Sequence, residues 1–116
     1  MIKLQGKKGT INISDAVFTN ITGNAATNCF GVKGMAMRSK TDGLVHLLRR
    51  ESMSKGVKVL YNEDGTVSVQ LHIIVDAGVN LMAVSRSIMN EVRYNVSRLT
   101  GVEVKSVDVC IDSMTN

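Results

Sequence analysis

The sequence predicts an α+β domain, a two-layer sandwich in which two main helices lie on one face of a mixed, mostly antiparallel sheet, with a short helix added. Three observations favour this class. Apolar residues alternate over residues 67–75 as in a strand, they recur at helical spacing over residues 80–99, and no proline, repeat or low-complexity tract interrupts the chain. We therefore expect residues 1–116 to form a single domain.

The first third of the chain predicts a strand, a helix and a second strand. Residues 10–13 alternate polar and apolar side chains, and Ser14 offers an N-cap for a helix that begins at Asp15. Apolar residues then recur every fourth position, and Gly31 is a suitable stop. The run from Gly31 to Met37 favours a strand.

A short amphipathic helix is predicted next. Leu44, Leu47 and Leu48 have helical spacing after the Asp42-Gly43 pair, and this helix ends near Ser54.

The second half of the chain predicts a hairpin, a long helix and a closing strand. Residues 57–61 and 67–75 alternate on either side of the turn Asn62–Gly65, which indicates a β-hairpin. The helix over residues 80–99 ends at Gly101. In the closing strand the apolar residues change phase, so Lys105-Ser106 marks either a bulge or the true start of the strand.

The sheet face opposite the helices is the first candidate interaction surface. On its central strand, Gln70, His72 and Ile74 alternate with the core positions. Ile74 is either covered by the short helix or another subunit, or it is a lone surface isoleucine, and the sequence leaves both interpretations open. Arg86 and Arg93, on one face of the long helix, complete the candidate surface.

A second interpretation is a nucleic-acid-binding module. The net charge of +4 is uneven, because residues 1–58 hold ten Lys and Arg against three Asp and Glu. Gly31, Lys33 and Gly34 form a GxxG of the kind that KH domains use to clamp a nucleic-acid backbone. The interpretation that we favour is that these glycines end a helix and allow a tight turn, so nucleic acid is not the expected partner.

No catalytic, cofactor or metal site is predicted. His46 and His72 stand in no metal-ligand spacing, and neither Cys29 nor Cys110 belongs to a CxxC pair. No apolar run approaches the length of a membrane span, and no signal peptide is visible. We therefore expect a cytoplasmic protein that is not an enzyme.

The ordered series of motifs resembles the alkaline shock protein (Gls-type, envelope stress response) family of Gram-positive bacteria, and in particular its short, YloU-like members. The resemblance runs from Gly9 to Ile111 and lies in the series rather than in one motif. Its segments are Gly9–Ser14, Asn28–Ala36, Asp42-Gly43-Leu44, Arg50-Glu51, Lys55–Val59, Val69–Val75, Val92-Arg93-Tyr94 and Leu99–Val109.

This resemblance implies a protein associated with alkaline or cell-envelope stress, with no catalytic residues to carry over. It implies protein contacts as the mode of action: assembly into a homo-oligomer, a link to a fatty acid kinase subunit with a dihydroxyacetone-kinase-like domain, or recruitment to the inner face of the membrane by a small membrane-anchored protein. An acyl-chain or small-molecule binding module is a further alternative, suggested by that kinase link and by an interior expected to be rich in methionine.

Overall fold

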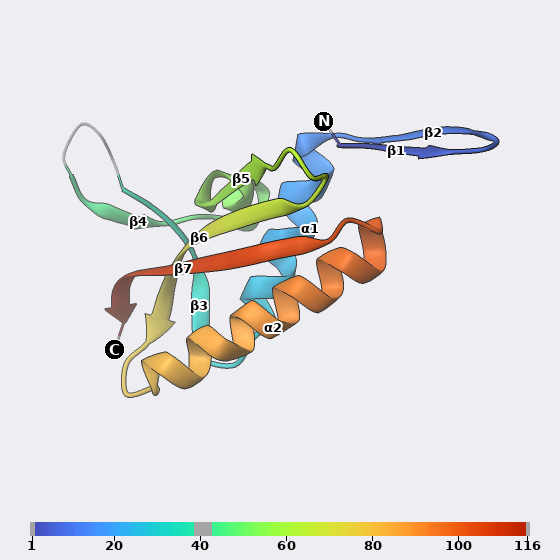
Figure 1. The fold of residues 1–116 in the computed structure, drawn as a ribbon. Helices are drawn as coiled ribbons and strands as arrows, with labels where there is room; N and C mark the ends of the chain where they lie inside the picture. Colours follow the sequence, from blue (N-terminus) through green and yellow to red (C-terminus); the bar gives the residue numbers. More distant parts are fainter. Residues whose placement is uncertain (1, 39–42, 116) are drawn as a thin grey trace.

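The computed structural model describes residues 2–38 and 43–115, which form an N-terminal hairpin, two helices and a five-stranded sheet (Figure 1). In chain order the elements are β1 (Ile2–Gly6), β2 (Gly9–Ile13), α1 (Asp15–Thr27), β3 (Val32–Arg38), β4 (Val45–Leu47), the 3₁₀ helix η1 (Arg50–Gly56), β5 (Val57–Tyr61), β6 (Val67–Asp76), α2 (Leu81–Thr100) and β7 (Val104–Thr115).

Strand β6 is the centre of the sheet. Its first half pairs antiparallel with β5 and its second half with β3, while β7 runs parallel along its other edge. Helix α2 connects β6 to β7, as the crossover between adjacent parallel strands requires. The sheet is therefore mixed, and the predicted α+β class is confirmed.

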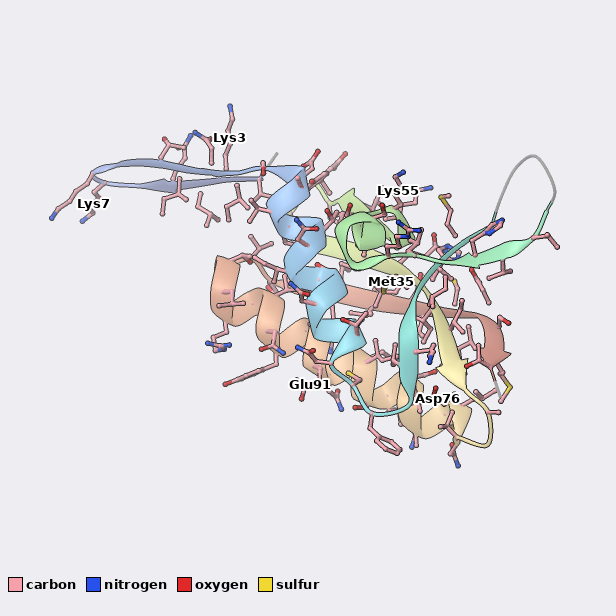
Figure 2. All side chains as sticks on the ribbon, turned by 180° about the vertical axis from the view of Figure 1, so that it is seen from behind. Lys3, Lys7, Met35, Lys55, Asp76 and Glu91 are labelled. Carbon is pink, nitrogen blue, oxygen red and sulfur yellow. The ribbon has the colours of Figure 1, made fainter. Side chains whose placement is uncertain are left out.

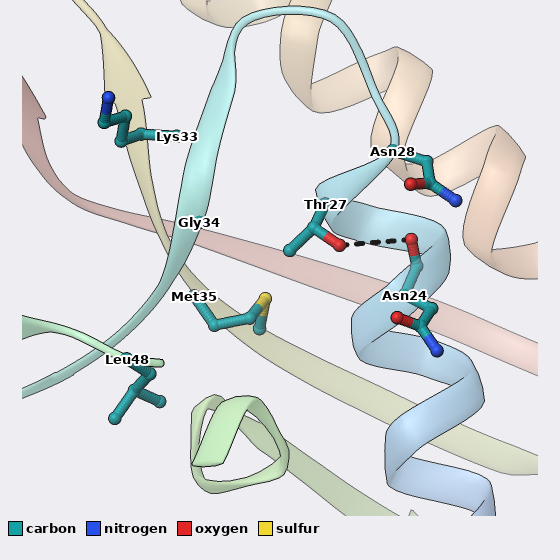
Figure 3. A pocket seen from close by; sticks show the side chains of 7 residues that line it. All are labelled: Asn24, Thr27, Asn28, Lys33, Gly34, Met35 and Leu48. Atoms are coloured by element: carbon teal, nitrogen blue, oxygen red, sulfur yellow. Dashed lines mark hydrogen bonds between the residues drawn. The ribbon is translucent and has the colours of Figure 1, made fainter. Parts of the chain in front are cut away.

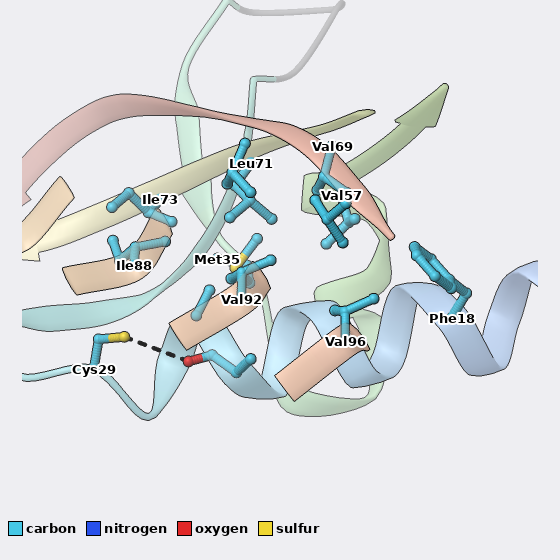
Figure 4. Packing of buried hydrophobic residues seen from close by; sticks show 14 of the residues in the cluster. Phe18, Cys29, Met35, Val57, Val69, Leu71, Ile73, Ile88, Val92 and Val96 are labelled. Atoms are coloured by element: carbon cyan, nitrogen blue, oxygen red, sulfur yellow. Dashed lines mark hydrogen bonds between the residues drawn. The ribbon is translucent and has the colours of Figure 1, made fainter. Parts of the chain in front are cut away.

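Both helices contribute to one hydrophobic core against the inner face of the sheet. Alternate residues of β6 are buried there, and Figure 4 shows Leu71 and Ile73 directed toward Ile88 and Val92 of α2. Phe18 of α1 belongs to the same cluster. The helical spacing seen in the sequence corresponds to the buried stripe of α2, formed by Val84, Ile88, Val92 and Val96.

The ends of the helices follow the capping signals. The Ser14 side chain accepts a hydrogen bond from the backbone N–H of Val17, and the Asn80 side chain accepts one from Ala83. Gly101 ends α2 with a φ of 76°, which favours glycine. In β7 the register shifts between Val104 and Ser106, so Lys105 is the extra residue of the expected bulge.

The predicted short helix over residues 44–54 is partly wrong. Residues 45–47 form strand β4, which pairs with β3, and the only helical segment described here is η1, from residue 50 to 56. The leucine spacing resembles a helix, but the pairing of Leu47 with Ala36 takes this segment into the sheet. Asp42, which the prediction placed before the helix, lies outside the described residues.

A hairpin of β1 and β2 projects from the body of the protein (Figure 1). The sequence predicted β2 but not β1. Only the base of the hairpin is attached to the core, through Ile2, Leu4 and Ile13. Lys7 lies at its far end, as Figure 2 shows.

Candidate functional site

The face of the sheet that points away from the core is not covered by α1 or α2. We call this surface the open sheet face. Its side chains come from β5, β6 and β7, and the strand register places them next to one another. They are Lys58, Leu60, Ser68, Gln70, His72, Asp108, Cys110 and Asp112.

Two side-chain contacts join β6 to β7 on the open sheet face. The Nδ1 atom of His72 lies 3.0 Å from an Asp112 carboxylate oxygen, and the amide of Gln70 lies 3.7 Å from the Cys110 sulfur. These contacts link the side chains of the two strands across the open sheet face.

A shallow hollow of about 230 Å³ lies beside these contacts. Leu60, which is 62% exposed, Lys58 and Asp108 line it together with Gln70. An exposed leucine beside a lysine, a carboxylate and an amide can offer a partner both apolar and polar contacts. A second hollow, next to His72 and Asp112, is bordered by Lys55 of η1.

The structure thus brings Gln70 and His72 together with four residues that the sequence did not single out: Lys58, Leu60, Asp108 and Asp112. The acidic pair alternates with Val107, Val109 and Ile111 in the sequence. This signal would have placed both carboxylates on the outer face, if β7 had been known to lie beside β6.

Ile74 requires a correction, because it does not belong to the exposed surface. Its side chain is only 4% exposed, so the interpretation as a lone surface isoleucine is wrong. Its cross-strand partner is Gly34, and a leucine of β4, Leu47, lies so close to Gly34 that an added Cβ would be 2.8 Å from its Cδ1. Strand β4 therefore covers this end of the outer face.

The two arginines of the candidate surface are both exposed on α2, away from the open sheet face. Arg93 donates a hydrogen bond of 3.1 Å to the backbone carbonyl of Lys105, the bulge residue of β7. Arg93 therefore ties the helix to the sheet.

The GxxG segment connects α1 to β3 and does not lie between two helices, as the KH arrangement requires. Gly31 is buried, with a φ of 87°, and an added Cβ would lie 3.1 Å from Val84. Gly34 is already part of β3. These positions agree with the interpretation that the glycines serve a turn and close packing.

Lys33, between these glycines, lines a pocket of about 220 Å³ with Asn24, Thr27, Asn28, Met35 and Leu48 (Figure 3). The Thr27 hydroxyl donates to backbone carbonyls of α1, and Figure 3 shows Lys33 pointing away from it. The pocket is lined by both polar and apolar side chains, and its lysine does not point toward Thr27.

Cys29 and Tyr61 have raised pKa values. Burial raises the pKa of the Cys29 thiol, which lies 3.4 Å from the Ala25 carbonyl oxygen (Figure 4), so its reactive thiolate form is disfavoured. Burial also raises the pKa of Tyr61, to about 12, and the hydrogen bond that Tyr61 donates to Asp15 adds to this effect.

The expectation of a methionine-rich interior is wrong for the methionines whose side chains are described. Of these five, only Met35 is buried. The other four are exposed: Met37, Met82, Met89 and Met114. One of the two grounds for an acyl-chain binding module, the methionine-rich interior, is therefore lost.

In residues 2–38 and 43–115, no group of three His, Cys, Asp or Glu side chains could hold a metal ion. None of the helices in this part of the chain has the length and apolar character to cross a bilayer.

The fold defines a class of small α+β domains with two helices on one side of a mixed sheet. Among solved structures it is similar to variants of the MamM CTD. One has a TM-score of 0.51 at 16% identity, with 86% of this chain and 98% of that chain covered, and another has a TM-score of 0.50 at 17% identity. At this level of identity the likeness concerns the fold alone.

The chain belongs to the alkaline shock protein 23 family, whose sequence model is described by a cell envelope-related function and matches residues 3–116. The chain is 34% identical to YloU of Bacillus subtilis strain 168 over 114 residues, which cover 97% of this chain and 94% of YloU. It is also 34% identical to Spy1614 of Streptococcus pyogenes serotype M6, with 97% and 93% covered. The family expected from the sequence is thus confirmed.

Proposed function

We propose that this chain is a non-enzymatic interaction or scaffold protein of the cell envelope and that it binds a protein partner through the open sheet face. The proposal rests on the uncovered face of the sheet, because both helices cover the other face and this face presents an exposed leucine among polar side chains. Family membership supports the association with the envelope.

The chemistry of the polar residues supports a binding role over a catalytic one. His72 contacts Asp112, but the thiol on the adjacent strand, Cys110, has its hydrogen bond with Gln70. Nucleophilic catalysis needs a nucleophile within hydrogen-bond reach of its base. The other thiol, Cys29, is buried.

The partner that we propose first is a fatty acid kinase subunit with a dihydroxyacetone-kinase-like domain, and the second is a small membrane-anchored protein. Either partner could keep a cytoplasmic chain close to the inner face of the membrane. An interface centred on Leu60 would bury an apolar side chain that is now in water, which favours association.

Binding of the purified full chain to the kinase subunit from the same cell tests this proposal. We expect Leu60→Asp to weaken the complex at least about tenfold, equivalent to 1.4 kcal/mol, because a carboxylate would replace the apolar contact. Tyr94→Asp, an equally exposed change on α2, is the matched control. Equal affinity for all three proteins would reject the open sheet face, and no binding of the wild type would reject this partner.

A further inference from the structure

The outer edge of β7 has unpaired backbone groups and little protection. Within the described residues β7 pairs with β6 alone, although it is twelve residues long. Edge strands are commonly shielded by lysine, proline or a covering element. Between the bulge at Lys105 and a second register shift at Asp112, residues 106–111 contain neither lysine nor proline, while Val107, Val109 and Ile111 favour a strand.

One side of α2 runs beside this edge. Arg93 reaches the Lys105 carbonyl in β7, and residues 82, 86 and 89 share its side of the helix by their spacing. On the opposite side, Ser87 interacts with Cys29, next to α1. Met82, Arg86 and Met89 therefore lie toward β7.

Apolar side chains accumulate at this edge. Met82 is 65% exposed, Met89 38% and Met114, at the end of β7, 48%. Val109 and Ile111, which face the same layer as α2, are only half-buried. Methionine adapts to irregular apolar partners and recurs at binding surfaces. We call this surface, formed by the β7 edge and the methionine side of α2, the methionine edge.

We propose that the methionine edge binds a second copy of this chain, with the two β7 strands antiparallel across a two-fold axis and the two α2 helices side by side. This inference rests on the proposed function, because it specifies one contact of the scaffold. A two-fold interface uses the same patch on both copies, so an unpaired edge with its own apolar border is self-complementary.

The charges on β7 and its length together favour one register. If Asp108 lay on the axis, its carboxylate would oppose that of Asp108 in the second copy. If Cys110 lay there, Asp108 would oppose Asp112. The registers with Val107, Val109 or Ile111 on the axis avoid this repulsion between like charges. Of these, Val109 lies nearest the middle of β7 (Val104–Thr115) and so pairs the greatest length of the two strands, with Val107 opposite Ile111.

The size of this surface suffices for a dimer. A strand of about ten residues extends roughly 33 Å, α2 extends about 30 Å, and the two layers together are about 20 Å deep. Each copy would therefore bury on the order of 600 Å², close to the roughly 800 Å² per partner that stable interfaces bury.

Sedimentation velocity of the full chain tests the proposal. We expect a dimer at micromolar concentration, and we expect Met82→Glu combined with Met89→Glu to weaken it at least about tenfold. Tyr94→Glu is the matched control, because Tyr94 is also 65% exposed on α2 but lies on another side. A wild type that stays monomeric, or a dimer that the paired glutamates leave intact, would overturn the proposal.

Disulfide crosslinking tests the register. In a Cys110→Ser background, Val109→Cys should give a crosslinked dimer on mild oxidation, whereas Leu60→Cys on the open sheet face should not. If Val109→Cys does not fold, mixing Val107→Cys and Ile111→Cys proteins makes the same test. A disulfide pattern that favours Leu60→Cys would contradict the assignment.

The methionine edge and the open sheet face can be tested independently. The Met82 and Met89 changes should leave the kinase subunit bound, and Leu60→Asp should leave the dimer intact. If the edge binds a strand of a different protein, the wild type will sediment as a monomer when pure, and the second copy is rejected as its occupant.

Discussion

Gly31 shows how a single residue can look functional in the sequence and serve packing in the structure. Its backbone has a φ of 87°, and its missing side chain leaves room for Val79 and Val84. The close approach of these valines joins the end of α1 to the start of α2. A sequence motif gives no information about such neighbours, which explains why the KH-like alternative could be raised from the sequence.

Gly31→Ala should destabilise the fold more than Gly65→Ala. Both glycines have a φ of 87°, but an added Cβ has nothing within 4 Å at position 65, whereas it would lie 3.1 Å from Val84 at position 31. We expect about 1 kcal/mol of lost stability from the backbone at each site, and a further loss of about 1–3 kcal/mol from overpacking at Gly31. Urea unfolding measures both, and equal losses would contradict this account of Gly31.

The burial of Ile74 is a property that the sequence around this residue could not predict. The alternation over residues 67–75 correctly placed Ile74 on the outer face, because this pattern depends only on neighbouring residues. Its burial depends on β4, which is distant in the sequence but adjacent through β3, and on Gly34 being small. Such cover depends on tertiary contacts, so it could not be predicted from the residues around Ile74.

At the scale of elements, the strongly periodic segments were predictable and the ambiguous ones were not. The hairpin of β5 and β6, and helix α2, follow long patterns that only one structure satisfies. The segment at Leu44 to Leu48 is short, and its spacing fits a helix even though pairing with β3 makes it a strand. Strand β1 was missed, although Ile2 and Leu4 alternate before the turn at Gly6.

Strand β5 is tied to the first turn of α1 by the hydrogen bond from Tyr61 to Asp15. Because the pKa of Tyr61 is raised to about 12, above the value of about 10 in an unfolded chain, the folded state keeps its proton to higher pH. This contribution to stability is complete below pH 10 and is lost as the pH rises from about 10 to 12.

Tyr61→Phe should remove this part of the pH dependence. Urea midpoints at pH 9 and pH 11, measured for both proteins, give the comparison. We expect the wild type to lose more stability than the variant over that interval, by a modest amount because Tyr61 remains partly exposed. Parallel losses in both proteins would contradict a role for this hydrogen bond.

At the scale of the whole molecule, three parts of the fold have different roles. The helices and the inner sheet face form the core, the open sheet face is proposed to bind a partner, and the methionine edge is proposed to bind a second copy. The sequence predicted the two layers and the candidate face through Gln70 and His72. It could not predict Leu60, Asp108 and Asp112 beside them, because their meeting depends on which strands are neighbours.

Photo-crosslinking in the native cell shows whether a protein lies on the open sheet face. A benzophenone amino acid is placed at position 60 or 70 on the open sheet face, and at position 94 on α2 as the control. The account predicts a protein adduct of one defined mass from both open-face positions and none of that mass from position 94. An adduct from position 94 alone, or none from positions 60 and 70, would contradict the claim that the open sheet face binds a protein partner.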